Sequence, residues 1–311
     1  SRVTRHASRV TIYFYRSNKL IIKKIMFDFS DLDDCIKALK SEDPMVRASA
    51  SRSLAIFTDK KSLKALMGAL KDDNATVRSN AVRSLGTRGD AKATDSIIKC
   101  LEEDEEEVRI RAAEIISIFG INDKAIKTLK NTLNEPSKLV QIWTLYSLVK
   151  LGEEEYFDRL LDYAEDEDSK NRANAIGALG KIGDERSLKP LINALRDTSW
   201  PVRYRSLYSL CELGWIDKIE GLEEFLSDES PKVRIIALKA IGNSPDREHI
   251  DNIKSSLHDE DWEVRYNAVG VLERIATGEE IPFVEKVLKC ERNPTVRISM
   301  ESLLEQLRES A

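Results

Sequence analysis

Apolar and polar positions along the chain follow a helical rhythm that restarts about every 31 residues. Each unit begins at a valine or its substitute, usually with a small residue four positions later and Leu or Ile eight positions later, as in Val77, Ala81 and Leu85. Spacings of four and eight place these residues on one face of an α-helix. The pattern therefore predicts the core-facing stripe of one helix in each unit, which we call the second helix.

An arginine follows most of these valines and fixes the register of the units. Val140-Gln141 and Asn171-Arg172 occupy the two places where one residue of the pair is substituted. The Arg positions are separated by 31 or 32 residues, so nine units in register run through the chain. The Val-Arg dipeptide itself stands at Val46-Arg47, Val77-Arg78, Val108-Arg109, Val202-Arg203, Val233-Arg234, Val264-Arg265 and Val296-Arg297.

Turn residues separate the units. Asp, Asn, Ser and Pro precede the second helix, as at Glu42-Asp43-Pro44, where they can cap its N-terminus. Glycine often follows it, as at Gly89, and a first helix with apolar spacing such as Leu188 and Leu191 completes the unit. One such hairpin cannot bury its apolar stripe alone, so we predict two-helix repeats that stack into a single solenoid over residues 26–311.

The segment from Asp168 to Asp184 contains the pattern Arg-x-x-Ala-x-x-Ala-Leu-Gly-x-Ile-Gly-Asp and resembles the short HEAT-like repeat, also called the phycobilisome-lyase-like repeat. The resemblance covers nearly the whole chain beyond residue 27. It implies an all-α fold, a right-handed α-α superhelix of nine two-helix repeats. It also implies a structural ladder between adjacent turns, which Gln141 interrupts and to which we assign Arg47, Arg78, Arg109, Arg172, Arg203, Arg234, Arg265 and Arg297.

The first 25 residues form a basic extension that differs from the rest of the chain. Residues 1–26 hold seven Lys or Arg and no acid, so the remainder has 42 basic and 54 acidic residues, a net charge of −12. We interpret the extension as an upstream stretch that precedes a start at Met26, or as a disordered segment. A transit or membrane-surface segment is the alternative interpretation.

Composition excludes several kinds of site. Four scattered cysteines without a Cys-x-x-Cys pair indicate buried, reduced thiols of a cytoplasmic protein, and neither zinc nor a disulfide framework. Three histidines without recurring His-Glu pairs predict no metal, and we expect no cofactor. No apolar run is long enough to cross a membrane. The net charge of −5 argues against indiscriminate DNA binding.

Helix geometry predicts which side chains point outward from the second helix. With the valine as zero and 100° per residue, positions 2, 3, 6 and 10 share an outward stripe, which the resemblance implies is the concave inner surface. The turn residues just before the valine extend it. Repeats four to eight place aromatic and basic residues there, and as partner-binding candidates we choose Trp143, Tyr146, Lys150, Lys181, Trp200, Tyr204, Arg205, Tyr208, Lys239, Trp262, Tyr266 and Arg274.

This surface favours a protein-interaction scaffold or adaptor that binds another protein or peptide, acidic in character, on the concave face of repeats four to eight. The absence of a nucleophile motif or phosphate loop favours binding over catalysis. Two alternatives stay open: a phycobilin-lyase-like enzyme that handles a prosthetic group, and nucleic-acid binding in a basic aromatic groove. We expect a monomer without a membrane partner. The first three repeats are less distinctive, with Arg52, Arg83, Arg111 and Glu114 on the stripe, and the first and last units are interpreted as mainly architectural.

Overall fold

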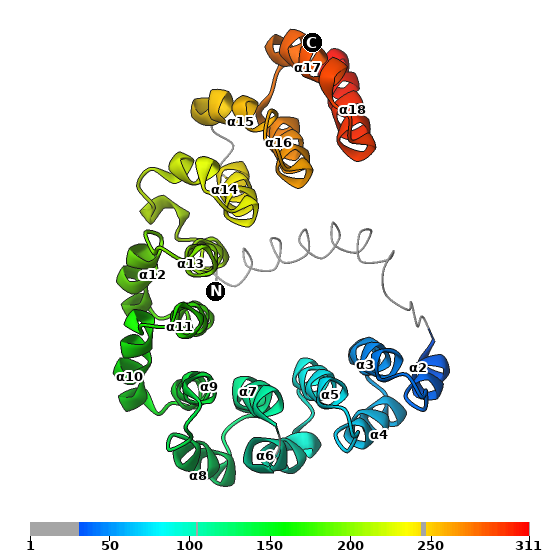
Figure 1. Cartoon of the computed structure of the whole chain (residues 1–311), viewed down its shortest axis with the longest axis vertical. Coiled ribbons are helices and arrows are strands. Elements are labelled where there is room, and N and C mark those ends of the chain that lie inside the picture. The colour runs from blue at the N-terminus through cyan, green and yellow to red at the C-terminus, as the bar shows by residue number, and fades with distance from the viewer. Residues whose placement is uncertain (1–30, 104, 244–246, 311) are drawn as a thin grey trace. The chain divides into compact units, whose positions relative to one another are not determined.

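The computed structural model describes residues 31–103, 105–243 and 247–310 (Figure 1). These residues contain helices and turns but no β-strand, which confirms the all-α class. They form two compact units: unit 1 ends at Phe157 and unit 2 begins at Asp158. The basic extension over residues 1–25 lies outside the described residues. The single solenoid, its right-handed superhelix and the count of nine repeats stay predictions.

Unit 1 consists of two layers of helices. The second helices α3, α5, α7 and α9 pack one beside the next in one layer, and α4, α6 and α8 lie in the other (Figure 1). Short 3-10 helices at Leu54–Ile56, Ala91–Ala93, Ile116–Phe119 and Glu154–Tyr156 occupy turns. The helices are α2 (Leu32–Ala38), α3 (Pro44–Ser53), α4 (Lys60–Ala69), α5 (Ala75–Arg88), α6 (Thr94–Glu103), α7 (Glu106–Ile115), α8 (Asp123–Thr132) and α9 (Lys138–Lys150).

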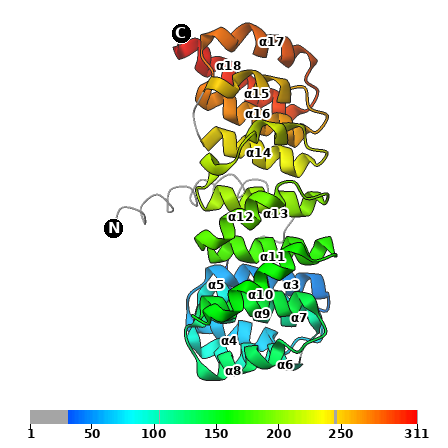
Figure 2. The same cartoon turned by 90° about the vertical axis from the view of Figure 1, so that its left-hand side faces the viewer.

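Unit 2 repeats this arrangement in successive tiers from α11 to α18 (Figure 2). Helix α10 (Phe157–Asp162) begins at the boundary between the units. The helices that follow are α11 (Ser169–Ile182), α12 (Leu188–Ala194), α13 (Trp200–Glu212), α14 (Pro231–Asn243), α15 (Ile250–Ser256), α16 (Trp262–Ile275), α17 (Ile281–Cys290) and α18 (Pro294–Ser310). Further 3-10 turns lie at Tyr163–Glu165, Glu185–Ser187, Arg247–His249 and Gly278–Glu280.

One first helix of unit 2 departs from the predicted pattern. Between α13 and α14 the chain forms two 3-10 helices, η7 (Ile216–Lys218) and η8 (Leu222–Ser227), instead of an α-helix. Gly221 starts η8 with a φ of 68°, a left-handed conformation that glycine adopts without a steric penalty. A glycine in this conformation prevents the α-helix from running through the segment.

The sequence register places the core as predicted. In α5, Val77, Ala81 and Leu85 are fully buried. The Asn74 side chain caps the helix by accepting hydrogen bonds from the backbone N–H groups of Thr76 and Val77. Burial of one apolar stripe per helix against its neighbours is the main source of stability in such an array.

The cysteines differ in exposure. Cys35 and Cys100 are buried, and burial raises the pKa of the Cys35 thiol to about 11. Cys211 is half-buried, whereas Cys290 is exposed at the end of α17, so the prediction of a buried thiol is wrong for Cys290. None of the four, all of which lie in the described ranges, forms a disulfide with another. None of the described helices combines the length and the apolarity that crossing a membrane requires.

Candidate functional site

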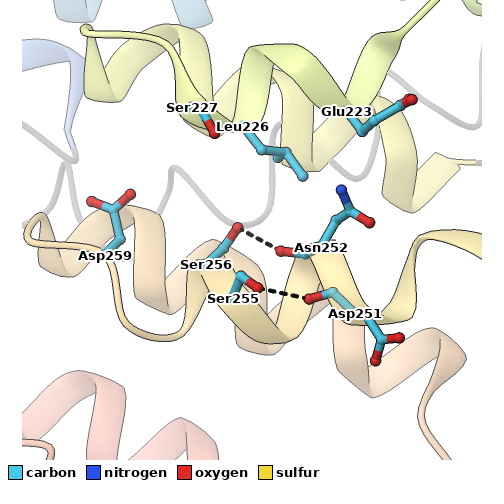
Figure 3. Close-up of a pocket in the computed structure, with 8 residues that line it drawn as sticks. All are labelled: Glu223, Leu226, Ser227, Asp251, Asn252, Ser255, Ser256 and Asp259. Carbon is cyan, nitrogen blue, oxygen red and sulfur yellow. Dashed lines mark hydrogen bonds between the residues drawn. The ribbon is translucent and has the colours of Figure 1, made fainter.

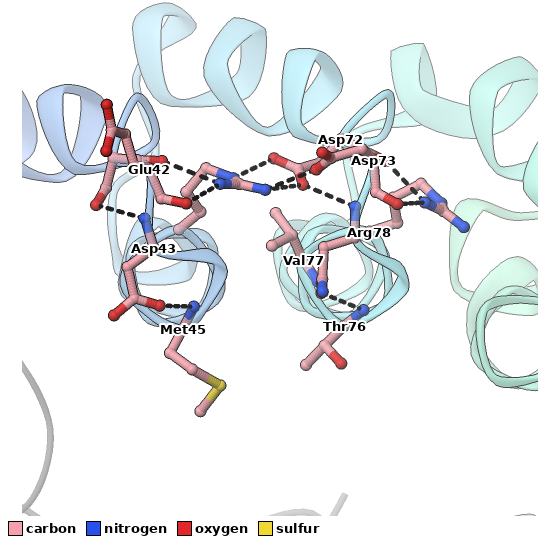
Figure 4. A network of polar contacts seen from close by, with 11 residues as sticks. Glu42, Asp43, Met45, Asp72, Asp73, Thr76, Val77 and Arg78 are labelled. Atoms are coloured by element: carbon pink, nitrogen blue, oxygen red, sulfur yellow. Dashed lines mark hydrogen bonds and ion pairs between the residues drawn. The ribbon is translucent and has the colours of Figure 1, made fainter.

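The repeated arginines connect each turn to the next repeat. The Nε and Nη2 atoms of Arg47 each donate to a different carboxylate oxygen of Asp72, at 2.8 Å, while its Nη1 donates to the Ser41 and Glu42 carbonyls. Arg78 then donates to the carbonyls of Asp72 and Asp73, which carries the network onward (Figure 4). One guanidinium thus satisfies the carbonyls of its own turn and binds the acid of the following turn.

The acid partner lies 25 to 27 residues beyond the arginine in the other repeats. Arg172, Arg203 and Arg265 make bidentate contacts at 2.7–3.0 Å. Gln141 cannot form an ion pair and donates instead to the carbonyl of Glu135. Arg297, in the last repeat, donates to the Leu288 and Glu291 carbonyls. The ion pairs are Arg78–Glu105, Arg109–Glu135, Arg172–Asp197, Arg203–Asp228, Arg234–Asp259 and Arg265–Glu291.

Two of the predicted binding residues in unit 1 are buried. Trp143 and Tyr146 on α9 are only 4% and 9% exposed, and their rings meet edge to face with centroids 5.5 Å apart. Burial raises the pKa of Tyr146, and so does the nearby charge of Glu114 on α7. The prediction that Trp143 and Tyr146 are exposed is therefore wrong, because these rings lie against neighbouring side chains. Lys150 is exposed at the end of α9.

In unit 2 the second helices present aromatic rings to solvent. Tyr208, Trp262 and Tyr266 are 36%, 36% and 38% exposed, and they are the exposed Tyr and Trp residues of the described part of the chain. Tyr204 is half-buried and stacks on Tyr208, with ring centroids 6.1 Å apart and planes 26° apart. Trp200, on the same helix, is also half-buried. We call these five residues, carried by α13 and α16, the aromatic face.

Cations accompany the aromatic face. The Lys232 ammonium group lies 5.1 Å from the centroid of the Trp200 ring, within the range of a cation–π interaction. Burial lowers the pKa of Lys239 on α14, an effect that Glu263 partly offsets. Arg274 donates to the Gly242 carbonyl at 2.8 Å and thereby connects α16 to α14. Lys181 is exposed at the end of α11.

Two glycines shape this surface, and the sequence analysis did not identify them. Both stand six residues after the start of the repeat, at Gly177 and Gly270. The Arg205 guanidinium extends across Gly177, where a Cβ atom would lie 3.2 Å from Nη1. A Cβ atom at Gly270 would meet nothing within 4 Å, so α16 has an open position between Tyr266 and Arg274. Glycine at position 6 of the register, where most other repeats carry a large side chain, is the signal that could have revealed both.

A polar pocket of about 400 Å³ lies elsewhere in unit 2, against η8 and α15 (Figure 3). Its Asp259 carboxylate already binds Arg234 at 2.7 Å, and its Ser255 hydroxyl donates to the Asp251 carbonyl. Within the described parts of the chain, no three His, Cys, Asp or Glu residues are grouped so that they could hold a metal ion. The pocket therefore offers polar atoms that already have hydrogen-bond partners, whereas the exposed Tyr and Trp rings of the described residues belong to the aromatic face.

The chain is similar to several known proteins, both in structure and in sequence pattern. The solved structure of E. coli YibA is 19% identical, covers 82% of this chain and 95% of its own, and has a TM-score of 0.49. The CpcE–CpcF complex of phycocyanin lyase from Nostoc sp. PCC7120 is 18% identical, with coverages of 89% and 94% and a TM-score of 0.42. No curated protein matches the chain. Residues 32–117, 67–148, 126–211 and 219–305 match the family model of the HEAT repeats.

Proposed function

Because the chain belongs to the HEAT-repeat family, we propose that it is a protein-interaction scaffold that binds its partner on the aromatic face of unit 2. Stacked helical repeats create extended surfaces without requiring catalytic groups, and function depends on the side chains that a particular surface carries. The single observation behind the proposal is the exposure of Tyr208 on α13 and of Trp262 and Tyr266 on α16, the two second helices that pack on either side of α14.

The composition of the aromatic face supports a protein partner. Tyr, Trp and Arg are the side chains that most often supply binding energy in protein interfaces, because they bury a large area and lose little conformational freedom. Exposed apolar groups that cluster on one surface usually mark an interaction site. Tyr204 and Tyr208 already stack on one another, so less ordering is required when a partner binds.

Charge favours an acidic partner. Arg205 and Lys232 are exposed beside the rings, and Lys239 is partly desolvated before any partner arrives. Glu212 and Glu263 are exposed acids on the same second helices. Because fixed cations near a desolvated surface favour anionic groups, we expect carboxylates of the partner to pair with these cations.

The proposal is confined to repeats five to eight. Trp143 and Tyr146 of repeat four are buried in unit 1, so their rings are not available to a partner without rearrangement. Among the residues predicted for the site, the exposed or half-exposed ones in unit 2 are Lys181, Trp200, Tyr204, Arg205, Tyr208, Lys239, Trp262, Tyr266 and Arg274.

Site-specific photo-crosslinking tests the proposal. A benzophenone side chain at exposed Glu263, which follows Trp262 on α16, is expected to capture one protein, and the same group at exposed Lys189 on α12 is expected to capture none. The double substitution Tyr208→Ala and Trp262→Ala should abolish the adduct, whereas Tyr163→Ala should preserve it. Circular dichroism verifies that each variant folds.

Each other outcome has a definite meaning. An adduct that survives the double substitution, or that forms equally from Lys189, contradicts the proposed surface. An adduct sensitive to nuclease would favour nucleic-acid binding. Saturable bilin binding with a spectral shift would favour handling of a prosthetic group.

A further inference from the structure

Unit 1 carries a cluster of arginines on its second helices that is separate from the aromatic face. Arg52 on α3 and Arg83 on α5 occupy the same register position, six residues after the valine, on helices that pack side by side. Arg111 lies on α7, the next second helix. Arg52 and Arg83 are exposed, and Arg111 is half-buried. We call these three residues the arginine cluster.

Arg83 is the member of this cluster that lacks a counter-ion. Its guanidinium has no ion pair or hydrogen bond within the part of the chain that the structure describes. Burial lowers its pKa, the positive charges of Arg111 and Arg52 lower it further, and Glu114 and Glu107 compensate only in part. Glu114 is itself bound by Arg111. At the Arg83 guanidinium, therefore, the positive charge of its neighbours outweighs their negative charge.

This excess of charge has a chemical consequence. An arginine stays protonated at any physiological pH, so the cluster cannot relieve its repulsion by losing a proton. The Nε atom of Arg111 is buried and has no hydrogen-bond partner, which adds an unused donor. An anion that approached Arg83 would reduce the repulsion and accept hydrogen bonds in a fork geometry that suits carboxylates.

We propose that the arginine cluster of unit 1 binds an extended acidic segment of a partner protein. Packed helices lie about 8–10 Å apart, and Arg52 and Arg83 extend from the same register position of two such helices. A polyproline II segment presents every third residue on one face, at intervals of about 9 Å. Carboxylates at every third residue would therefore meet successive arginines as the segment crosses α3 and α5.

The charge of the whole chain favours a short acidic segment over a nucleic acid. Beyond residue 26 the chain has a net charge of −12, so a long polyanion would be repelled wherever it extended past the cluster. A nucleic acid also gains most of its affinity from many phosphate contacts, and this cluster offers three arginines. A peptide that carries a few spaced carboxylates matches the number and spacing of the guanidinium groups.

Peptide titration on the full chain tests the inference. The probe is a fluorescein-labelled peptide of four Glu-Pro-Pro units, and its affinity is measured by fluorescence anisotropy. We expect binding that weakens as salt increases and that weakens at least tenfold in the double variant Arg52→Ala, Arg83→Ala. The control Lys127→Ala removes an exposed cation from α8, outside the second helices, and should change the affinity less than twofold.

Further probes separate the possible outcomes. The same peptide with Gln in place of Glu should not bind, since recognition depends on the carboxylates. If only Arg205→Ala weakens binding, or if a single-stranded DNA of equal charge binds at least as tightly, the inference is wrong. Failure of the crosslink at Glu263 leaves this result intact, because the two experiments probe different units.

Discussion

Units 1 and 2 share one repeat register but present different chemistry on their second helices. In unit 1 the large rings Trp143 and Tyr146 are buried, and the exposed Arg83 has no ion pair within the described residues. In unit 2 the rings of Tyr208 and Trp262 are exposed. The core positions are alike in both, so the difference lies in side chains that the fold does not constrain.

The comparison indicates that stability and recognition use separate positions of the same repeat. The valine and the arginine after it maintain the core and the turns, so they recur in both units. Positions 2, 3 and 6 are free to change, and they range from Gly177 to Arg83 and Tyr208. Substitutions at the recurring positions should therefore affect folding, whereas those at variable positions should affect binding.

The largest expected effect is on the free energy of unfolding. It should differ between two of the ion pairs that the repeated arginines form. Arg203 in unit 2 makes a bidentate contact with Asp228, and the side chains are 12% and 7% exposed. Arg109 in unit 1 contacts Glu135 at 3.2 Å, with exposures of 21% and 23%. We expect Arg203→Ala to reduce the free energy of unfolding by about 3 kcal/mol and Arg109→Ala by about 1 kcal/mol.

Urea titration followed by circular dichroism measures both losses. Tryptophan fluorescence adds resolution, because three of the four tryptophans belong to unit 2. Equal losses for the two variants would show that burial of the pair does not determine its contribution. Arg203→Lys keeps the positive charge but loses the bidentate geometry of the guanidinium group. Compared with Arg203→Ala, it should recover only part of the stability.

The next largest expected effect on stability comes from the glycines at position 9 of the register, nine residues after Val77 or after its substitute Asn171. A Cβ atom at Gly180 would lie 2.4 Å from the Ser209 Cβ atom and 3.5 Å from its backbone Cα atom. At Gly86 in unit 1, the nearest atoms belong to the Ile115 side chain, at 3.0 Å. We expect Gly180→Ala to destabilise unit 2 by about 2 kcal/mol because α11 and α13 must separate.

Gly86→Ala should cost about 1 kcal/mol, since the Ile115 side chain must shift by only a few tenths of an ångström. Thermal unfolding of both variants checks the order. Hydrogen exchange should then show weaker protection in α11 and α13 for the unit 2 variant alone. A larger loss at Gly86 would mean that unit 1 accommodates a methyl group less well than unit 2.

How far the sequence predicts this molecule depends on the kind of interaction. Periodicity correctly placed Val77 and Leu85 in the core, because backbone geometry alone determines which face of a helix they occupy. Periodicity wrongly predicted that Trp143 is exposed, because a large ring at an outward position of the register can still pack against neighbouring side chains. The unpaired charge of Arg83 could not be predicted, since it depends on Glu114 binding Arg111 instead.

A smaller effect is expected on how the stability of unit 2 depends on acidic pH. The hydrogen bond from Arg265 holds the pKa of Glu291 below its ordinary value, and the Asn293 backbone N–H contributes. The stabilisation from a carboxyl with a lowered pKa is present above its unfolded pKa of about 4.3 and is lost as pH falls through the folded pKa. Glu291→Gln should therefore lose about 1 kcal/mol at neutral pH.

Unfolding free energies measured from neutral to acidic pH provide the check. The gap between Glu291→Gln and the unsubstituted chain should be constant at neutral pH and shrink below about pH 4.3. If this difference in unfolding free energy did not depend on pH, the charge of the Glu291 carboxylate would not contribute to stability, and only the shape of the side chain would. Glu135→Gln in unit 1 is the matched comparison, at a pair with longer contacts.

The smallest expected effect has the opposite sign and tests whether the aromatic face retains glycine for binding. Gly270 lies within α16, and a Cβ atom there meets nothing within 4 Å. Because alanine favours the helix by about 0.8–1 kcal/mol over glycine, Gly270→Ala should raise the free energy of unfolding by nearly that amount. If the open position admits a partner side chain, the same variant should weaken capture at this surface even though it is more stable. A variant that is more stable and binds equally well would leave Gly270 without a role in recognition, and the difference between the units would then rest on the exposed rings.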